Sequence, residues 1–185
     1  MIKKIENYIP FNEQEENDKQ EILRRLNSGE RLLGRDNLSA HFTASAWVVN
    51  KQRDKVLMAY HNLYDSWAWL GGHVDGEEDL LKVAIKEVQE ESGLSYVMPV
   101  TEDIFSLEIL AVDGHFKKGK YVPSHLHLNA TFLVEADETA ELRHKPDENS
   151  SVGWFSLDDA IEASKEEWFK EHIYNKLNAK LMAYK

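Results

Sequence analysis

Three glutamates, Glu87, Glu90 and Glu91, lie close together in the chain and are its clearest candidates for chemistry. In a helix their side chains would share one arc of about 100°. Like charges on one arc repel one another, so the arrangement is unfavourable without a counterion. A hard divalent cation such as Mg2+ binds carboxylate oxygens and would relieve that repulsion. The group therefore indicates a divalent-metal site or a solvated acidic helix face, and three clustered acids alone favour the solvated face.

Two adjacent glycines, Gly71 and Gly72, shift the balance toward a binding site. Glycine allows a ligand to approach the backbone closely. The glycines follow an aromatic run that contains Tyr64, Trp67 and Trp69. These rings could stack on a base, although packing in the core is the more common role of such aromatic residues.

A helix over Asp79–Ser92 is needed to hold the glutamates in place. This segment contains no Pro or Gly and consists mostly of good helix formers. Gly93 then supplies the usual helix stop. The predicted core face consists of Leu81, Ala84, Ile85 and Val88, and the predicted solvent face of Lys82, Lys86 and Gln89.

The stretch Gly72–Leu94 resembles the signature of the Nudix hydrolases, G-x5-E-x7-R-E-U-x-E-E-x-G-U, in which U is aliphatic. The residues that match in register are Gly72, Glu78, Glu87, Val88, Glu90, Glu91, Gly93 and Leu94. One specified position departs, since Lys86 stands where the family has arginine. A match of this length at fixed spacing is far more specific than a lone glycine motif. The resemblance implies an α/β fold, the α/β/α sandwich with a mixed β-sheet.

The resemblance also implies a metal-dependent hydrolase that cleaves a diphosphate linkage in a nucleotide-type or related small molecule. A diphosphate repels an attacking hydroxide, and metal ions neutralise its oxygens and lower the pKa of bound water. By resemblance, Mg2+ (with Mn2+ as an alternative) would bind Glu87, Glu90, Glu91 and the carbonyl of Gly72. Glu78 would support the loop through a salt bridge or hydrogen bonds.

The family offers two alternatives to this activity. A catalytically silent Nudix domain could sense a ligand or bind a partner, but such a domain has no need for the intact glutamate set. A Nudix-type isomerase acting on an isoprenoid diphosphate would want a catalytic cysteine in the family pattern, and the chain has no cysteine.

A general base must lie within reach of the attacking water. Glu90 or Glu91 could serve, and some family members use a glutamate on a distant loop instead. The chain has a charged loop at Asp137–Ser151, and loops of this length are often functional. Glu148 is our candidate base in this loop, where the competing acids are Asp147, Glu138 and Glu141.

Lys86 and His73 are the candidate substrate-binding residues. Lys86 could also brace Glu90 or Glu78, or simply face solvent. A lysine offers a point charge on a flexible stem, whereas arginine makes two parallel hydrogen bonds. His73 lies inside the glycine loop and is therefore expected to lie near the substrate.

Two further histidines, His125 and His127, alternate with leucines and so point to one face of a predicted strand. They could contact phosphate or a base. Histidines whose hydrogen bonds are satisfied within the sheet are about twice as common as histidines that contact a ligand, because the side chain is often merely amphipathic.

The remaining elements suggest a mixed sheet covered on both faces. The predicted strands are His41–Val49, Lys55–His61, Trp67–Leu70, runs within Tyr96–Val112, His125–Glu135 and Ser151–Phe155. The predicted helices after the sheet are Leu157–Ala163 and Lys165–Ala183. Gly114–Pro123 is expected to be a mobile loop. Residues 1–37 are expected to form a helical extension, with Asn12 or Asn17 capping a helix that ends at Ser28–Gly29, and residues 38–185 the Nudix domain.

Composition excludes several classes of function. The chain of 185 residues has no cysteine, which excludes disulfides, zinc–thiolate sites and thiol catalysis. A net charge of −11 argues against sequence-independent binding to nucleic acid. No stretch approaches the ~20 apolar residues of a membrane span. We therefore expect a cytoplasmic protein that binds a small-molecule diphosphate rather than nucleic acid or membrane, either as a monomer or as a homodimer.

Overall fold

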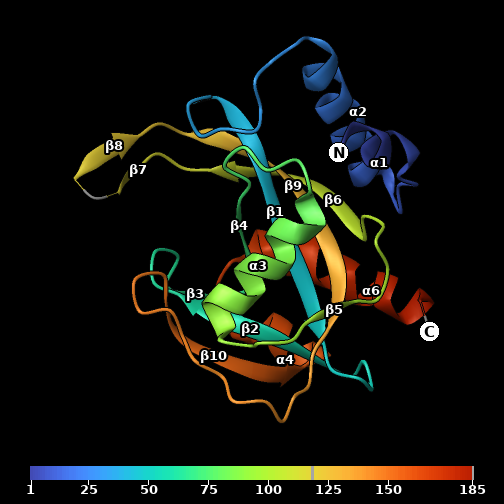
Figure 1. Ribbon diagram of the computed structural model, residues 1–185, viewed down its shortest axis with the longest axis vertical. Helices are drawn as coiled ribbons and strands as arrows, with labels where there is room; N and C mark the ends of the chain where they lie inside the picture. The colour runs from blue at the N-terminus through green and yellow to red at the C-terminus, as the bar shows by residue number, and fades with distance from the viewer. Residues whose placement is uncertain (118, 185) are drawn as a thin grey trace.

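The computed structural model describes residues 1–117 and 119–184, and a curled mixed sheet lies at its centre (Figure 1). The order of the sheet's main path is β10 (Asn149–Ser156), β2 (Lys55–His61), β1 (Ala40–Val49), β9 (His125–Glu135) and β5 (Met98–Pro99). Three more strands pair with this path: β3 (Ser66–Ala68) with β2, β4 (Leu70–His73) with β1, and β6 (Ser106–Val112) with β9. Strands β1 and β9 run parallel, whereas the other pairings in this sheet are antiparallel.

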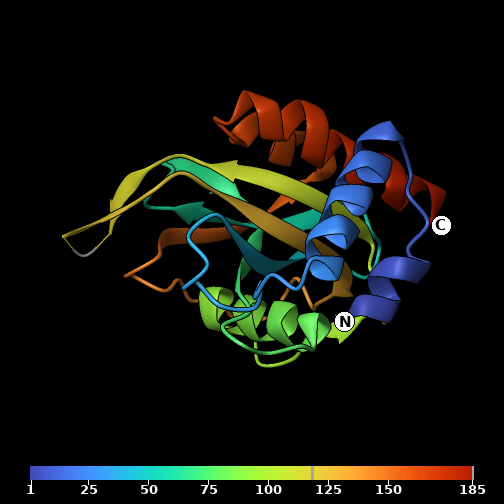
Figure 2. The ribbon, with the colours of Figure 1, turned by 90° about the horizontal axis from the view of Figure 1, so that it is seen from above.

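Helices cover both faces of the sheet, which confirms the expected α/β/α sandwich (Figure 2). Helix α3 (Leu80–Ser92) lies on one face. The other face is covered by α4 (Leu157–Ala163), α5 (Glu167–Phe169), the π-helical turn η1 (Lys170–Tyr174) and α6 (Asn175–Ala183). Each half of the sandwich therefore has a hydrophobic core of its own.

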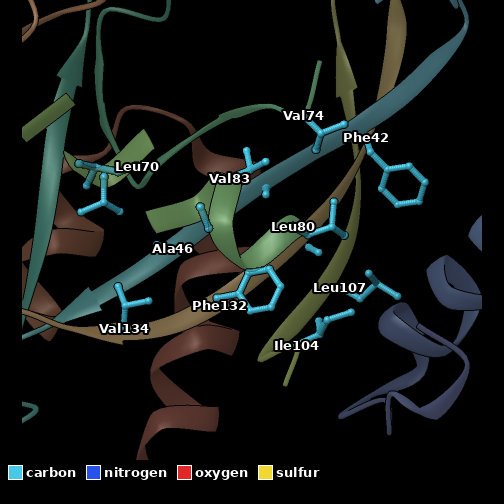
Figure 3. Packing of buried hydrophobic residues seen from close by; sticks show 14 of the residues in the cluster. Phe42, Ala46, Leu70, Val74, Leu80, Val83, Ile104, Leu107, Phe132 and Val134 are labelled. Carbon is cyan, nitrogen blue, oxygen red and sulfur yellow. The ribbon is translucent and has the colours of Figure 1, made fainter. Parts of the chain in front are cut away.

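Alternation along β1 separates the two cores, because successive side chains of a strand point to opposite faces. Phe42 and Ala46 belong to the cluster that also contains Val83 of α3, as Figure 3 shows. Trp47 and Val49 belong instead to the cluster under the C-terminal helices. All ten residues of β1 are buried, so this strand is the centre of the molecule.

The N-terminal segment contains two helices, α1 (Ile2–Asn7) and α2 (Glu13–Asn27). Asn12 caps α2, since its side-chain oxygen accepts a hydrogen bond from Glu15 N at 3.0 Å. Ile5 and Ile22 are fully buried in the same cluster as the sheet. The extension thus packs against the domain.

One expectation about a loop was wrong. Gly114–Pro123 contains an antiparallel hairpin of β7 (His115–Lys117) and β8 (Lys120–Val122), which projects from the body of the molecule (Figure 1). Position 118, part of that expectation, lies outside the described residues. The positive φ of Gly119, 77°, allows the tight turn that joins the strands.

In the part of the chain that the structure describes, no helix combines the length and apolar character needed to cross a membrane.

Candidate active site

Helix α3 is bounded by the two residues expected to bound it. Asp79 caps its beginning by accepting a hydrogen bond from Lys82 N at 3.2 Å. Gly93 ends it in the left-handed conformation, with φ 73°. The backbone therefore starts and stops the helix where the sequence predicted, which fixes the position of every glutamate along it.

The predicted rotation of α3 about its axis was partly wrong. Leu81 and Ile85, expected in the core, are only half-buried, whereas Leu80 and Val83 are buried. The acids and the apolar residues share one face. Near the helix start that face is apolar, whereas toward the helix end it carries Glu87 and Glu91 beside the buried Val88. The prediction of separate apolar and acidic arcs did not include this difference between the two ends of the helix.

Glu91 lies in this face and is only 5% exposed. Gly71 N donates a hydrogen bond to its Oε2 at 3.1 Å. Burial raises the pKa of Glu91 to about 8, and the charges of Glu87 and Glu148 add to the shift while the Gly71 hydrogen bond opposes it. Without a counter-charge, burial therefore favours the protonated form of this carboxyl.

Glu87 lies one turn earlier, directly against Gly72. A Cβ added to Gly72 would lie 2.6 Å from the carboxyl carbon of Glu87, so any other residue at position 72 would collide with this side chain. Burial raises the pKa of Glu87, and the neighbouring Glu90 adds to the rise. The glycine is thus required for a close approach between strand β4 and the acid.

Glu90 is more exposed and binds two lysines. Its carboxylate oxygens lie 3.2 Å from Lys86 Nζ and 3.4 Å from Lys145 Nζ. The hydrogen bond from Lys86 is the main reason that the pKa of Glu90 is lowered. Lys86 therefore pairs with Glu90, one of the two acids that it was predicted to brace. Glu78 is exposed and takes part in none of the ion pairs found among residues 1–117 and 119–184, so of the salt bridge or hydrogen bonds expected for it the salt bridge is missing.

The loop between β9 and β10 docks on the end of α3. Asn149 Nδ2 donates to the carbonyl of Glu91 at 3.1 Å, and Arg143 N donates to the carbonyl of Ser92 at 2.8 Å. Lys145 bridges from Glu90 to Glu148, whose Oε2 lies 3.0 Å from its Nζ. Sequence reasoning missed Lys145 and Asn149, because their role exists only once the loop has docked.

The docked position of this loop distinguishes Glu148 from Glu138 and Glu141, which were also candidates for the general base. Glu148 lies close enough to raise the pKa of both Glu87 and Glu91. Glu138 instead pairs with Lys55 at 2.5 Å, and Glu141 pairs with Arg143. Among these loop acids, the contacts place Glu148 with the glutamates of α3.

The residues fit a divalent cation in charge and in donor chemistry. Four carboxylates, those of Glu87, Glu90, Glu91 and Glu148, face two ammonium groups, Lys86 and Lys145. The oxygens of the three α3 acids do not form a ready-made group of ligands within the described part of the chain. Glu90 and Glu91 each bind protein partners, so a cation must compete with Lys86 for Glu90.

The aromatic residues and the histidine proposed as substrate contacts pack against other rings. Trp67 packs edge-on against Phe155 at 4.8 Å between ring centroids, and Trp69 packs edge-on against Tyr174 at 5.9 Å. These two rings are partly buried against the core under the C-terminal helices, as the commoner interpretation held, whereas Tyr64 is exposed and lies against the ring of His61. His73 lies next to Gly72 in the chain, but its ring is 4.9 Å from that of His127.

We expect Lys86→Ala to lower any turnover about two- to fivefold, because exposed ion pairs are worth about 0.2–1 kcal/mol. Lys86→Arg should keep or raise turnover, since a guanidinium can hold Glu90 with two hydrogen bonds. Steady-state kinetics at several Mg2+ concentrations measure both effects. Lys82→Ala is the matched control, because Lys82 pairs with Glu77. An unchanged rate for Lys86→Ala would show that Lys86 does not brace the site.

Comparisons with known proteins point to one family. The family model of the NUDIX domain matches residues 40–177. The m7GpppN-mRNA hydrolase NUDT17 of Xenopus laevis is 31% identical over 117 residues, which are 62% of this chain and 38% of that protein. The chain thus spans well under half the length of this relative.

Solved structures share the fold at low identity. A C. elegans Ap4A hydrolase binary complex is 21% identical with a TM-score of 0.56, over 77% of this chain and 96% of that chain. The E. coli dihydroneopterin triphosphate pyrophosphohydrolase is 14% identical with a TM-score of 0.54, over 73% of this chain and 92% of that chain.

Proposed function

The chain belongs to the Nudix hydrolase family, and from this premise we propose that it is a metal-dependent pyrophosphohydrolase acting on a nucleotide-type or related small-molecule diphosphate. The observation that supports the proposal best is the placement of two acids of low exposure, the half-buried Glu87 beside Gly72 and the buried Glu91 beside Gly71. Burying two carboxyls together raises the pKa of both groups, so the arrangement is costly in a protein that has no cation for them.

Mg2+, or Mn2+ in its place, would be held by Glu87, Glu90, Glu91 and the carbonyl of Gly72. Such an ion neutralises phosphoryl oxygens and lowers the pKa of bound water. The residues of the chain have separate tasks. Gly71 N fixes the carboxyl of Glu91, and Lys86 and Lys145 hold Glu90.

Glu148 is the proposed general base. Its side chain is 39% exposed, so it can reach a water at the rim of the site. We expect Glu148→Gln to lower turnover about 100-fold, the usual effect of losing a general base, and to flatten the acidic limb of the pH–rate profile. Glu141→Gln, on the same loop but paired with Arg143, should change neither. A Glu148→Gln rate within about threefold of wild type would place the base elsewhere.

A hydrolysis screen with product identification tests the function. The panel should contain nucleoside triphosphates, dinucleoside polyphosphates, nucleotide sugars, coenzymes, a cap dinucleotide and a capped RNA, each with Mg2+ or Mn2+. Glu90→Gln provides the blank for contaminating enzymes. Metal-dependent cleavage by the wild type alone supports the proposal. Absence of cleavage across the panel, with ligand binding retained, would favour the silent sensing domain.

The cap dinucleotide and the capped RNA serve as a matched pair. The relative from Xenopus laevis is named for a capped mRNA, whereas a net charge of −11 opposes binding of a long polyanion. We expect the dinucleotide to be cleaved at least as efficiently as the RNA.

A further inference from the structure

Four histidines gather on the side of the sheet away from α3. They come from three adjacent strands: His41 from β1, His73 from β4, and His125 and His127 from β9. The register of the strands brings these histidines together, because His41 pairs with His127 and Thr43 pairs with His73. The ring centroids of His41, His73 and His127 lie 4.9–5.1 Å apart, and one ligand nitrogen from each lies within 4.8 Å of the others.

The hydrogen bond of His41 leaves a lone pair aimed into the protein. Its Nδ1 lies 3.1 Å from the carbonyl oxygen of Asn37. A carbonyl only accepts, so Nδ1 carries the proton and Nε2 bears a lone pair. This Nε2 is buried, and among the described residues it has no hydrogen-bond partner. A buried acceptor without a partner is costly and calls for a ligand.

His125 shares only the first half of this pattern, because its Nε2 lies within hydrogen-bonding distance of His127 Nε2. Its Nδ1 lies 2.8 Å from the carbonyl oxygen of Pro123, and its Nε2 lies 3.1 Å from Nε2 of His127. Two nitrogens on one ion, each at about 2.0–2.1 Å, are about 3.0–3.4 Å apart. Metal-binding histidines usually donate the other ring N–H to a carbonyl or carboxylate, as His41 and His125 do.

The environment favours the neutral form of His41 and of His127. Burial lowers the pKa of His41. Burial, followed by the neighbouring imidazoles, lowers the pKa of His127 to about 2. Neutral imidazole is the form that binds metals. A site for phosphate would need positive charge, so the cluster is poorly suited to hold an anion.

We propose that His41, His73 and His127, with His125 as a fourth ligand, bind one transition-metal ion of the Zn2+ type. Imidazole nitrogens favour Zn2+, Ni2+ or Cu2+, whereas Mg2+ prefers oxygen. This site is separate from the carboxylates, because Gly72 faces Glu87 while His73 contacts His41 and His127. The proposed histidine site does not depend on whether the chain is a hydrolase. An ion there would tie β1, β4 and β9 together next to the glycines.

The test is a Zn2+ titration of the metal-free full chain by calorimetry in excess Mg2+, with Co2+ absorption spectra to report nitrogen ligands. We expect one Zn2+ per chain in the wild type. His127→Gln should weaken binding at least about 100-fold, because even partners of metal ligands are worth 10–100-fold. Circular dichroism checks that each variant is folded, and His73→Gln is the second variant if His127→Gln fails to fold.

Two controls separate this site from others. His172→Gln removes a half-exposed histidine in η1, and Glu90→Gln weakens the carboxylate site, so both should bind Zn2+ as the wild type does. Loss of Zn2+ binding in Glu90→Gln with retention in His127→Gln would assign the ion to the carboxylates and overturn the proposal. Failure of the wild type to bind Zn2+ would overturn it as well.

Discussion

Glu91→Gln is expected to abolish most hydrolysis while making the metal-free protein more stable at neutral pH. Loss of a metal ligand should lower turnover at least about 100-fold, since even the loss of a partner of a ligand costs 10–100-fold. Gln keeps an oxygen that can accept a hydrogen bond from Gly71 N, which in the wild type donates to Oε2 of Glu91. It also removes a carboxyl whose ionisation in a buried position destabilises the fold.

The sign of the pH dependence follows from the raised pKa. The pKa of Glu91 is about 8 in the folded protein, against 4.5 for an ordinary glutamate. Between these values the folded protein binds a proton that the unfolded chain has lost, so stability falls as pH rises. Below pH 4.5 the carboxyl is protonated in both states and its full contribution is present. The advantage of Glu91→Gln should therefore grow from about pH 4.5 to about pH 8 and then level off.

Urea unfolding of metal-free wild type and Glu91→Gln, at both ends of that pH window, measures the effect. Glu141→Gln is the control, because its exposed side chain should leave the pH dependence unchanged. Saturating Mg2+ should reduce the difference between wild type and Glu91→Gln, since the ion stabilises the ionised carboxylate. Equal pH dependence in both proteins would show that Glu91 does not carry the raised pKa.

Local patterns predicted some of the elements but not the strand that carries the glycines. The predicted strand Trp67–Leu70 is two strands, β3 and β4, and the glycines lie within β4. The bounds of β2, β9 and α4 agree with the predicted ranges, and Asp79 and Gly93 bound α3. Alternation and helix capping depend on neighbouring residues, so the sequence contains them. The fixed spacing of the glutamates could be recognised for the same reason.

Contacts across long separations could not be predicted. The histidine cluster requires the parallel pairing of β1 with β9, which joins His41 to His127. Sequence analysis placed His125 and His127 on one face, but nothing local brought His41 or His73 to them. Lys145 joins the carboxylates only because its loop folds back onto α3. Register and loop docking depend on the packed core, and therefore on the whole chain.

The N-terminal extension illustrates a buried network that the polar sequence of α2 did not reveal. Glu15 is fully buried. Its carboxylate lies 2.9 Å from Lys180 Nζ and 3.3 Å from Lys176 Nζ, and it accepts from Ser106 Oγ at 2.6 Å. Burial alone would raise the pKa of Glu15, but the two lysines outweigh it and hold the pKa below its ordinary value. This network joins α2 to β6 and α6.

Glu15→Ala should therefore destabilise the protein by about 3–5 kcal/mol, because it leaves buried ammonium groups without their partner. Lys176 retains Glu108 at 3.1 Å, so most of the cost should fall on Lys180. Urea unfolding measures the loss, and Glu13→Ala, at an exposed position on the same helix, is the control. In a double-mutant cycle, Lys180→Ala should cost much less in the Glu15→Ala background than in the wild type, since the unpaired charge is then gone. Additive losses, or a Glu15→Ala loss no larger than that of Glu13→Ala, would show that the network does not hold the extension to the domain.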